Sequence, residues 1–465
     1  MGEKAGAGVG WDCALDGRGY FAGFISRNDI LFMRLAVPVL IFASLAQFAE
    51  GEDYQPLYTY EGREYITSGG GAQDLLMVPD ADTDGVEDIA VLQSGDVTLV
   101  SGATGNILWD HEFSVRIRPA GQHLMESGDD IDGDGISDLY FVQEAALNRE
   151  DCGCWFYATV LSGVDGTVLR DLTLDWDEST TGSNIVVTGL STGPDLSGDG
   201  IRDLALTVSH HFPPVGREEL YLFWNPIRQK FFRKHEIEGY TGGVLREDLV
   251  PLGDLTGDGL PELANHGWEV EEEAGHSDKT DFYIRDGATF EVIQILKNDP
   301  DRTRTYASVT DAFSYRDVDN SVLLAVAGRT ANFYSGQIYI LDWQTATIVD
   351  QFGHPEITEF AGFAGPDMRP IPDMTGDGIP ELAALTMVGR EEMELLVFKN
   401  VTNEVFARIT FPYDLDAGFF SYIIGLSDIT GDGRGHFGYF SNDGTLTVFR
   451  SQVAMPGPGA VMVGS

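Results

Sequence analysis

Short apolar stretches separated by glycine- and aspartate-rich turns run through most of the chain. Four of them follow one another at residues 123–126, 138–143, 156–162 and 167–172. They are rich in β-branched and aromatic residues, which is typical of strands, and GVDG (residues 163–166) forms a turn between the last two. No long segment shows the 3.6-residue apolar period of an amphipathic helix. The pattern therefore predicts an all-β protein.

An acidic nine-residue segment recurs between the first and second strand of each such unit. We number these segments by repeat: loop 1 (residues 80–88), loop 2 (130–138), loop 3 (195–203), loop 4 (254–262), loop 6 (373–381) and loop 7 (428–436). They begin about 50 to 65 residues apart, except for a gap of about twice that length between loops 4 and 6. That gap holds a degraded copy, loop 5 (residues 317–325), which lacks the glycine and the later carboxylates. Seven units of four strands predict a seven-bladed β-propeller.

The last unit stops one strand short. It supplies apolar stretches at residues 421–425, 436–440 and 446–449, whereas residues 57–60 and 64–66 precede the first full unit. We expect this N-terminal segment to complete the seventh blade and close the ring. The alternative is a leader without fixed structure.

Loop 2 (DIDGDGISD) shows the chemistry of these segments best. It places side-chain oxygens at its first, third and fifth positions: Asp130, Asp132 and Asp134. Gly135 allows the backbone to bend so that the Ile136 carbonyl points inward, and Asp138 closes the shell from the start of the next strand. Such oxygens suit a hard cation such as Ca²⁺; an EF-hand closes instead with a glutamate at its twelfth position, between helices. The alternative is an Asx-type turn, in which carboxylates cap backbone N–H groups but stay unneutralised and repel one another.

Charge and cysteine content restrict the class of protein further. The chain has 29 Lys and Arg against 74 Asp and Glu, a formal net charge of −45, which argues against nucleic-acid binding. Calcium in the loops would neutralise many of these carboxylates. Three cysteines are too few for a disulfide scaffold. Cys152 and Cys154 are compatible with either a small strained disulfide or two thiols.

The N-terminal region indicates export. Residues 35–46 form an apolar run behind Met33, which fits a secretory signal peptide cleaved after Ala46 or Ala49, with translation starting at Met33. The run is short for a transmembrane span, and the alternative is an uncleaved anchor. We therefore divide the chain into an upstream segment with signal peptide (1–49), the propeller (50–452) and a flexible C-terminal tail (453–465), which resembles the opening of a PEP-CTERM sorting tail. We expect a secreted, cell-surface or periplasmic protein with no transmembrane span in the mature chain.

The loops and the strands that follow them resemble FG-GAP (VCBS-type) repeats, as in the seven-bladed propeller of integrin α chains. The resemblance covers roughly residues 56–450. It implies up to six Ca²⁺ sites on the lower face of the propeller, with loop 5 empty. Beyond loop 2, the implied ligands are Asp80, Asp82, Asp84, Asp88, Asp195, Ser197, Asp199, Asp203, Asp254, Thr256, Asp258, Glu262, Asp373, Thr375, Asp377, Glu381, Asp428, Thr430 and Asp432. In loop 7, His436 stands where the closing carboxylate belongs, and nitrogen is a poor Ca²⁺ ligand.

Extracellular calcium modules bind their ion with a Kd on the order of 10⁻⁴–10⁻³ M, so these sites fill outside the cell and act on stability. We expect a secreted calcium-binding propeller that serves as a binding or adhesion module for an extracellular protein or polysaccharide. The alternatives are a structural part of a cell-surface assembly and a lyase-like polysaccharide-active enzyme, which needs a base near a polarised carboxylate. Candidate groups for the enzyme form no recognisable constellation: His210, His211, His266 and His276, with Lys279 or Arg246. Three tryptophans either stack on sugars or fill blade-to-blade packing: Trp224, Trp268 and Trp343.

Overall fold

A computed structural model describes part of the chain. The described residues are 54–62, 72–93, 96–113, 125–146, 154–174, 184–193, 195, 197–212, 216–228, 230–236, 250–268, 280–296, 308–316, 321–329, 336–353, 368–388, 392–412, 422–441 and 444–451. All described residues belong to one compact unit, Ala46–Ser465. The expected signal peptide, Cys152 and the C-terminal tail lie outside the described residues. Within the described part, no helix is long and apolar enough to cross a membrane.

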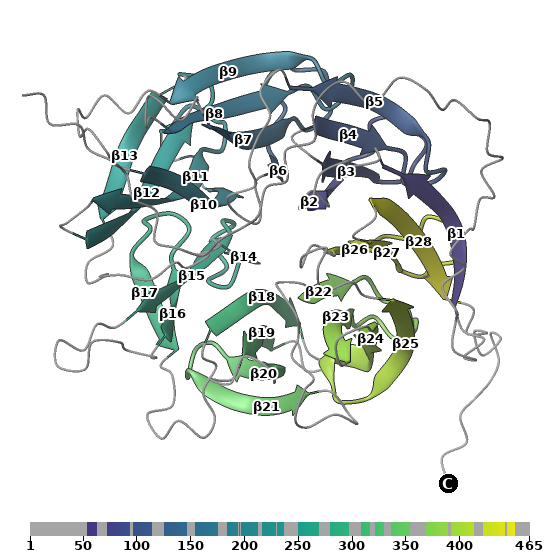
Figure 1. Cartoon of the computed structure of the whole chain (residues 1–465). Helices are drawn as coiled ribbons and strands as arrows, with labels where there is room; N and C mark the ends of the chain where they lie inside the picture. Colours follow the sequence, from purple (N-terminus) through teal and green to yellow (C-terminus); the bar gives the residue numbers. More distant parts are fainter. Residues whose placement is uncertain are drawn as a thin grey trace, which may run out of the picture. The chain divides into compact units, whose positions relative to one another are not determined.

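Seven antiparallel sheets of four strands each make up this unit (Figure 1). Blade one holds β2 (Ala72–Val78), β3 (Asp88–Gln93), β4 (Asp96–Val100) and β5 (Ile107–Glu112); blade two holds β6 (Met125–Ser127), β7 (Leu139–Ala146), β8 (Cys154–Leu161) and β9 (Val168–Leu174); blade three holds β10 (Asn184–Thr192), β11 (Leu204–Phe212), β12 (Gly216–Asn225) and β13 (Lys230–Glu236). Blade four holds β14 (Val250–Gly253), β15 (Glu262–Trp268), β16 (Thr280–Arg285) and β17 (Val292–Leu296); blade five holds β18 (Ser308–Arg316), β19 (Val322–Arg329), β20 (Gly336–Asp342) and β21 (Thr347–Gly353). Blade six holds β22 (Met368–Ile371), β23 (Glu381–Val388), β24 (Glu392–Phe398) and β25 (Val405–Pro412); blade seven holds β26 (Tyr422–Leu426), β27 (His436–Phe440), β28 (Thr445–Ser451) and β1 (Tyr54–Glu61). The prediction of an all-β, seven-bladed propeller is confirmed.

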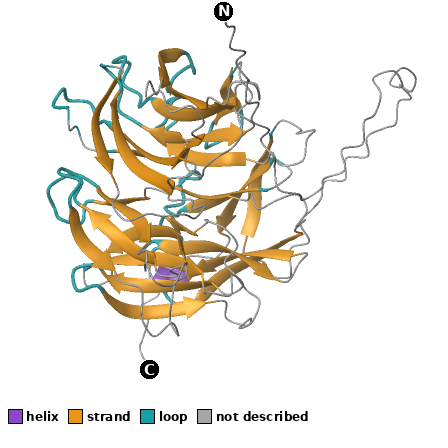
Figure 2. Cartoon of the chain, turned by 60° about the vertical axis from the view of Figure 1, so that its left-hand side comes forward, coloured by secondary structure: helices purple, strands orange, loops and turns teal. Residues whose placement is uncertain are grey.

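The first strand of each blade lies innermost, and these strands close a ring. Each contacts the next in sequence, from β2 through β6, β10, β14, β18 and β22 to β26, and β26 contacts β2 again. Figure 2 shows that strands account for most of the described chain; the helix found among the described residues is the short 3₁₀ turn η1 (Lys399–Val401). The acidic loops join the innermost strand of a blade to its second strand, as predicted. The first four residues of loop 5 lie outside the described chain.

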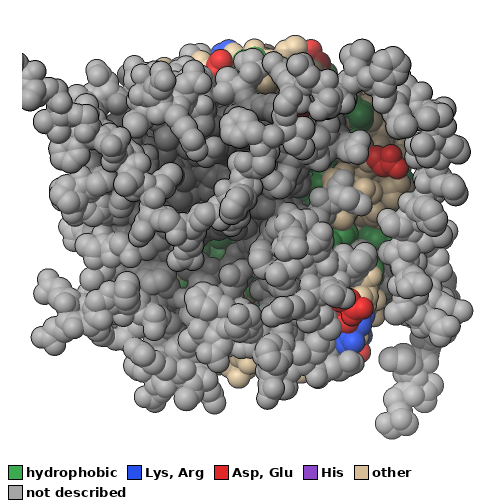
Figure 3. All heavy atoms as spheres, in the orientation of Figure 1, with side chains coloured by type: hydrophobic (Ala, Val, Ile, Leu, Met, Phe, Trp, Pro, Cys, Tyr) green, Lys and Arg blue, Asp and Glu red, His purple; other side chains and the backbone are tan. Residues whose placement is uncertain are grey.

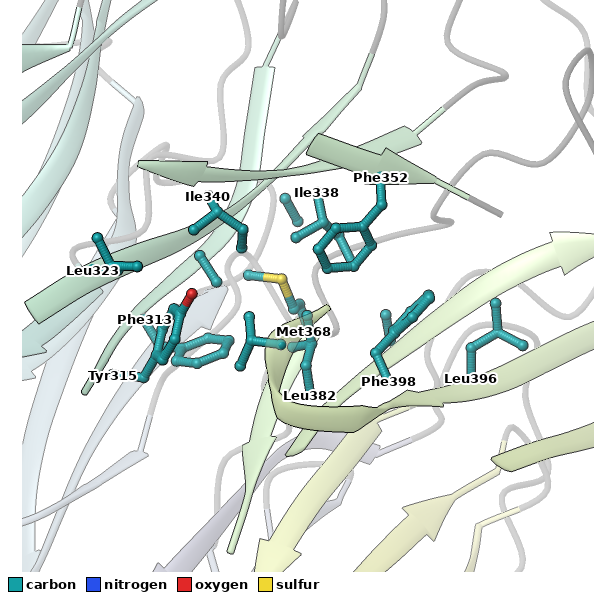
Figure 4. Close-up of a cluster of buried hydrophobic side chains, with 14 residues drawn as sticks. Phe313, Tyr315, Leu323, Ile338, Ile340, Phe352, Met368, Leu382, Leu396 and Phe398 are labelled. Atoms are coloured by element: carbon teal, nitrogen blue, oxygen red, sulfur yellow. The ribbon is translucent and has the colours of Figure 1, made fainter. Parts of the chain in front are cut away.

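The hydrophobic core lies between neighbouring blades. Sheets of blades five and six pack face to face through one cluster of buried side chains (Figure 4), in which the Phe352 and Phe398 rings lie 5.0 Å apart. Trp224 is fully buried in a corresponding cluster between blades two and three, beside Tyr140. Trp343 packs at the edge of the cluster between blades four and five. Trp224 and Trp343 therefore contribute to packing between blades. This agrees with the packing role expected for them as an alternative to stacking on sugars.

A hydrogen bond and a close ring contact link blade one to blade two. Trp109 on β5 donates from Nε1 to the carbonyl of Gly163, in the turn between β8 and β9, at 3.0 Å. Gly166 in the same turn has a φ of +69°, and a Cβ there would come 2.5 Å from the indole ring. Glycine is required at this position for both reasons. The turn predicted from the sequence therefore also receives an aromatic side chain from the preceding blade.

The outermost strand of blade seven comes from the N-terminal side of the chain. β1 pairs with β28 in antiparallel register, from Tyr54 opposite Ser451 to Glu61 opposite Thr445. Tyr60 is buried in the cluster shared by blades seven and one. The Tyr58 hydroxyl donates to the Gly102 carbonyl of blade one at 2.7 Å, as Trp109 does one blade later. That this pairing holds the ring closed stays a prediction.

Deletion of residues 50–66 should lower the melting temperature, because it uncovers the edge of β28 and removes the buried Tyr60 side chain. Tyr60→Ala alone should reduce the free energy of unfolding by about 3 kcal/mol, as for other large aromatic truncations in cores. Thr59→Ala, on the exposed face of the same strand, is the matched control and should change it by less than about 0.5 kcal/mol. An unchanged melting temperature after the deletion would contradict the closure role.

Candidate metal centre

The first aspartate of each loop organises the turn around itself. In loop 2, Asp130 Oδ1 accepts hydrogen bonds from the backbone N–H groups of Gly133 (2.6 Å) and Asp134 (3.2 Å). Its Oδ2 accepts one from Gly135 (2.8 Å), whose φ of +97° allows the bend expected from the sequence. The loops therefore do contain Asx-type turns. These hydrogen bonds leave room for a cation, since each carboxylate oxygen has two lone pairs.

The closing carboxylate is buried in loops 1, 2, 3, 4 and 6. Asp138 is fully buried at the start of β7, where its Oδ2 accepts from the Ile131 N–H (2.6 Å) and its Oδ1 from the Gly163 N–H (3.2 Å). Asp88 in loop 1 is held in the same way by Ala81 and Gly102. Because the Gly163 carbonyl also accepts from Trp109, hydrogen bonds run without a break from the closing carboxylate of loop 2 to the outer strand of blade one.

Four loops bring three acidic side chains together. In each group the three ligand atoms lie within 4.8 Å of one another: Asp80, Asp82 and Asp88; Asp130, Asp132 and Asp138; Asp254, Asp258 and Glu262; Asp373, Asp377 and Glu381. A Ca²⁺ ion binds oxygen at 2.3–2.6 Å, so two of its ligands stand at most about 5 Å apart. The three oxygens of each group are therefore close enough together for one Ca²⁺ ion to bind all of them.

The remaining acidic positions of loops 1 and 2 lie outside these groups. Asp84 and Asp134 each accept a hydrogen bond at 2.9 Å from the backbone N–H two residues further on, of Val86 and Ile136. Acidic side chains (red) are also visible at the rim of the face drawn in Figure 3. The assignment of individual residues as metal ligands stays a prediction.

Loop 6 contains one buried carboxylate oxygen that lacks a hydrogen-bond donor among the described residues. Glu381 is fully buried at the start of β23, and its Oε2 accepts from the Met374 N–H at 2.5 Å. Its Oε1 has no hydrogen-bond partner in the described structure, and neither has the buried Oδ1 of Asn400 from the facing turn. Buried oxygens are normally paired, because leaving one unpaired costs about 1–3 kcal/mol. Asn400 itself faces the loop with its Nδ2, which donates to Asp377 Oδ2 at 2.8 Å. A cation between Glu381 Oε1 and the carboxylates of Asp373 and Asp377 would satisfy the unpaired Glu381 oxygen, so the residues present fit a hard metal ion.

Burial makes the closing carboxylates weak acids. It raises the pKa of both Asp88 and Asp138 to about 6, and the charges of the neighbouring loop aspartates add to the shift. Burial likewise raises the pKa of Glu381 to about 7 and raises that of Glu262. In the absence of a cation, the folded loops therefore favour protonation of these groups. A bound divalent ion would reverse this preference.

Loops 3 and 7 differ from the other four. In loop 3 the predicted ligands Ser197, Asp199 and Asp203 surround the side-chain amide of Asn225. In loop 7, His436 is buried and its Nε2 lies 3.4 Å from Thr430 Oγ1. Its Nδ1 has no partner within the described residues. Neither loop supplies a cluster of three acidic groups in the part of the chain that the structure describes.

Sequence reasoning missed two residues of these sites, Asn225 and Asn400. They lie 22 residues after Asp203 and 23 after Asp377, in the turn between the third and fourth strands of their blades. The same turn recurs at a fixed place in each repeat, and this regularity was the available sign that its residues lie near the acidic loops.

The candidate catalytic groups of the enzyme alternative are only partly described. His210 and His211 lie on β11 and His266 on β15, without described side chains, whereas His276, Lys279 and Arg246 lie outside the described residues. Cys154 begins β8, and its possible partner Cys152 is likewise outside.

Comparison with known proteins finds distant structural likeness. No protein-family model matches the chain, and a search of curated proteins finds no match. Similar solved structures include the Dos1 propeller (9% identity, 84% of this chain and 81% of that chain covered, TM-score 0.45) and Kuenenia stuttgartiensis hydrazine synthase (14%, 84% and 99%, TM-score 0.47). A third is the β-propeller domain of Myceliophteria thermophila Cps50 (Swd1) (11%, 85% and 99%, TM-score 0.43). At such identities the likeness concerns the fold alone, and membership of the FG-GAP family stays a prediction.

In EDTA, the stability of the protein should fall as the pH rises from about 4 to about 7. The raised pKa values of Asp88, Asp138 and Glu381 mean that these groups hold protons more tightly in the folded chain. Their contribution is complete below the ordinary carboxylate pKa and is lost as the pH passes about 6 to 7. Urea unfolding at each pH measures the free energy of unfolding. In the variant Glu381→Gln, the part of the decrease near pH 7 should be missing, because Glu381 has the highest pKa of the three groups. With millimolar Ca²⁺ the fall should be absent; identical profiles with and without the ion would contradict the assignment.

Proposed function

We propose that this protein is a secreted calcium-binding β-propeller that acts as a binding or adhesion module for a protein or glycan ligand. The observation that carries the calcium part is the convergence of three acidic side chains in each of four loops, together with one buried carboxylate oxygen in loop 6, Glu381 Oε1, that has no hydrogen-bond donor among the described residues. All the side chains concerned would bind the metal through oxygen. Ca²⁺ prefers oxygen ligands, whereas softer metals prefer nitrogen or sulfur ligands.

The proposed role of the ion is structural. It would neutralise like charges that the fold keeps together and fix each loop to the turn of its own blade. Through Gly163 and Trp109, the effect in loop 2 reaches the neighbouring blade. Because modules with such loops bind Ca²⁺ at high micromolar to millimolar concentration, the sites suit a compartment outside the cytoplasm.

A binding role is supported by the architecture. A closed ring of seven sheets is a rigid frame whose loops gather at its two ends, where they can vary without disturbing the core. The strong negative charge argues against nucleic acid as the ligand.

Removal of Ca²⁺ should lower the melting temperature by many degrees. At an ion concentration 100 times the Kd, one site contributes about 2.7 kcal/mol to the free energy of unfolding, and several sites act on one ring. Differential scanning calorimetry in 10 mM Ca²⁺ and in EDTA measures the difference, with Mg²⁺ as the control ion, which demands a stricter octahedral geometry. Equal melting temperatures in Ca²⁺ and EDTA would contradict the metal assignment.

Glu381→Gln should have opposite effects in the two conditions. In EDTA above pH 7 it should raise the melting temperature, because it removes a buried charge whose pKa burial has raised. In Ca²⁺ it should weaken ion binding by about tenfold or more, as seen when calcium sites lose a ligand charge. Glu392→Gln, at an exposed position on the adjacent strand β24, is the matched control and should do neither. A loss of stability in both conditions would indicate a purely structural carboxylate.

The ligand is tested by a glycan-array screen and a polysaccharide-degradation screen of the full chain, each with and without Ca²⁺. Saturable binding without turnover, lost in EDTA, is the expected result. Release of unsaturated sugar products would instead establish a lyase and overturn the assignment as a binding module.

A further inference from the structure

An amide group lies among the ligand oxygens of loop 3. The side chain of Asn225, at the end of β12, is fully buried. Its Nδ2 lies 2.8 Å from Ser197 Oγ, 2.8 Å from Asp199 Oδ2 and 2.9 Å from Asp203 Oδ1. These three residues hold the third, fifth and ninth positions of the loop, which the calcium prediction assigns as ligands. One amide nitrogen therefore donates its two N–H bonds to three oxygens that a cation would otherwise bridge.

The orientation of this amide is fixed from its other side. Asn225 Oδ1 accepts a hydrogen bond from the backbone N–H of Arg228 at 2.5 Å. If the amide were turned by half a rotation, its NH₂ would face that N–H and its oxygen would face three other oxygens. Both contacts would then be repulsive. The group pointing into loop 3 is therefore a donor, which cannot ligate a metal ion.

The donor replaces a hydrogen bond that the backbone of this blade cannot make. In loop 2 the closing Asp138 accepts from the backbone N–H of Gly163. The strand register places Leu161 opposite Leu139 in blade two and Trp224 opposite Leu204 in blade three, so Pro226 stands where Gly163 stands. Proline has no N–H. The Asn225 side chain supplies the missing donor to Asp203.

The charge of loop 3 is also partly compensated by the chain itself. The Arg228 guanidinium Nε lies 3.9 Å from Asp199 Oδ2. The second oxygen of Asp203 accepts from the Ser197 N–H at 2.9 Å. Loop 3 thus pairs its carboxylates with protein donors. In loop 6 the corresponding amide, Asn400 Nδ2, donates to Asp377 Oδ2 at 2.8 Å, but Glu381 Oε1 has no donor among the described residues.

We propose that loop 3 is an ion-independent copy of the calcium loops, in which the Asn225 amide occupies the place of the cation. The protein then binds Ca²⁺ at loops 1, 2, 4 and 6, and loop 3 stays folded when the ion is removed. This inference rests on the proposed calcium binding.

Hydrogen–deuterium exchange of the unaltered full chain tests the contrast directly. On transfer from millimolar Ca²⁺ to EDTA at a temperature where the ring stays folded, peptides that cover loops 2 and 6 should lose protection, while a peptide that covers residues 197–203 should not. Loss of protection in loop 3 to the same extent would overturn this inference and leave the calcium proposal standing. If no loop responds, the calcium proposal falls, and the contrast falls with it.

Asn225→Asp tests the role of the single nitrogen atom, because it exchanges NH₂ for oxygen without changing the shape of the side chain. It should add one bound Ca²⁺ per chain, counted by equilibrium dialysis, and widen the difference in melting temperature between Ca²⁺ and EDTA. Asn400→Asp, beside loop 6, is the matched control: its loop already takes an ion, so the count should not change. An unchanged count for a folded Asn225→Asp would overturn the inference. If Asn225→Asp folds only with Ca²⁺ present, the result supports the inference. If this variant does not fold at all, the hydrogen–deuterium exchange experiment decides whether the inference holds.

Discussion

The structure depends on carboxylates of like charge held close together before the second strand of four blades. In four blades, three such groups lie within 4.8 Å of one another, and the closing member is fully buried. Water screens the charge of the buried closing member poorly, so the folded chain has to compensate it in another way. The described loops share backbone N–H donors but differ in what else compensates the charge. In blade three one side-chain amide contacts three loop oxygens, in blade six an amide contacts one, and in our proposal Ca²⁺ compensates the loops of blades one, two, four and six.

The same carboxylates connect the loops to the ring. Asp138 receives the N–H of Gly163, whose carbonyl receives the indole of Trp109 from the preceding blade. Tyr58 makes the corresponding contact from β1 to Gly102, next to Asp88. A change in charge at a loop can therefore alter the contacts at a blade interface. The rest of such an interface consists of apolar packing, as in the cluster between blades five and six. Through this link, the proposed ion would stabilise blade interfaces as well as its own loop.

Much of this arrangement could be predicted from the sequence. The alternation of short apolar stretches with turns, and the regular spacing of the loops, predicted four-stranded blades and their number, because both patterns are local and repeated. The positions of Asp130, Asp132 and Asp138 around one point followed from the turn that Gly135 permits. Asn225 and Asn400 could not be found in the same way, because they reach the loops from a turn more than twenty residues away. Their approach depends on the pairing register of β11 with β12 and of β23 with β24, and on Pro226 in place of a glycine. Such contacts follow from the assembled sheet, not from a motif.

The account as a whole can be tested by counting metal ions. The full chain can be dialysed to equilibrium against millimolar Ca²⁺, and calcium on both sides of the membrane measured by inductively coupled plasma mass spectrometry. The excess on the protein side, divided by the protein concentration, gives the number of bound ions while the weak sites stay filled. The account predicts at least four calcium ions per chain, one for each of the four acidic clusters. A chain that retains no calcium would show that protein hydrogen bonds alone compensate the loops, and it would contradict the central claim.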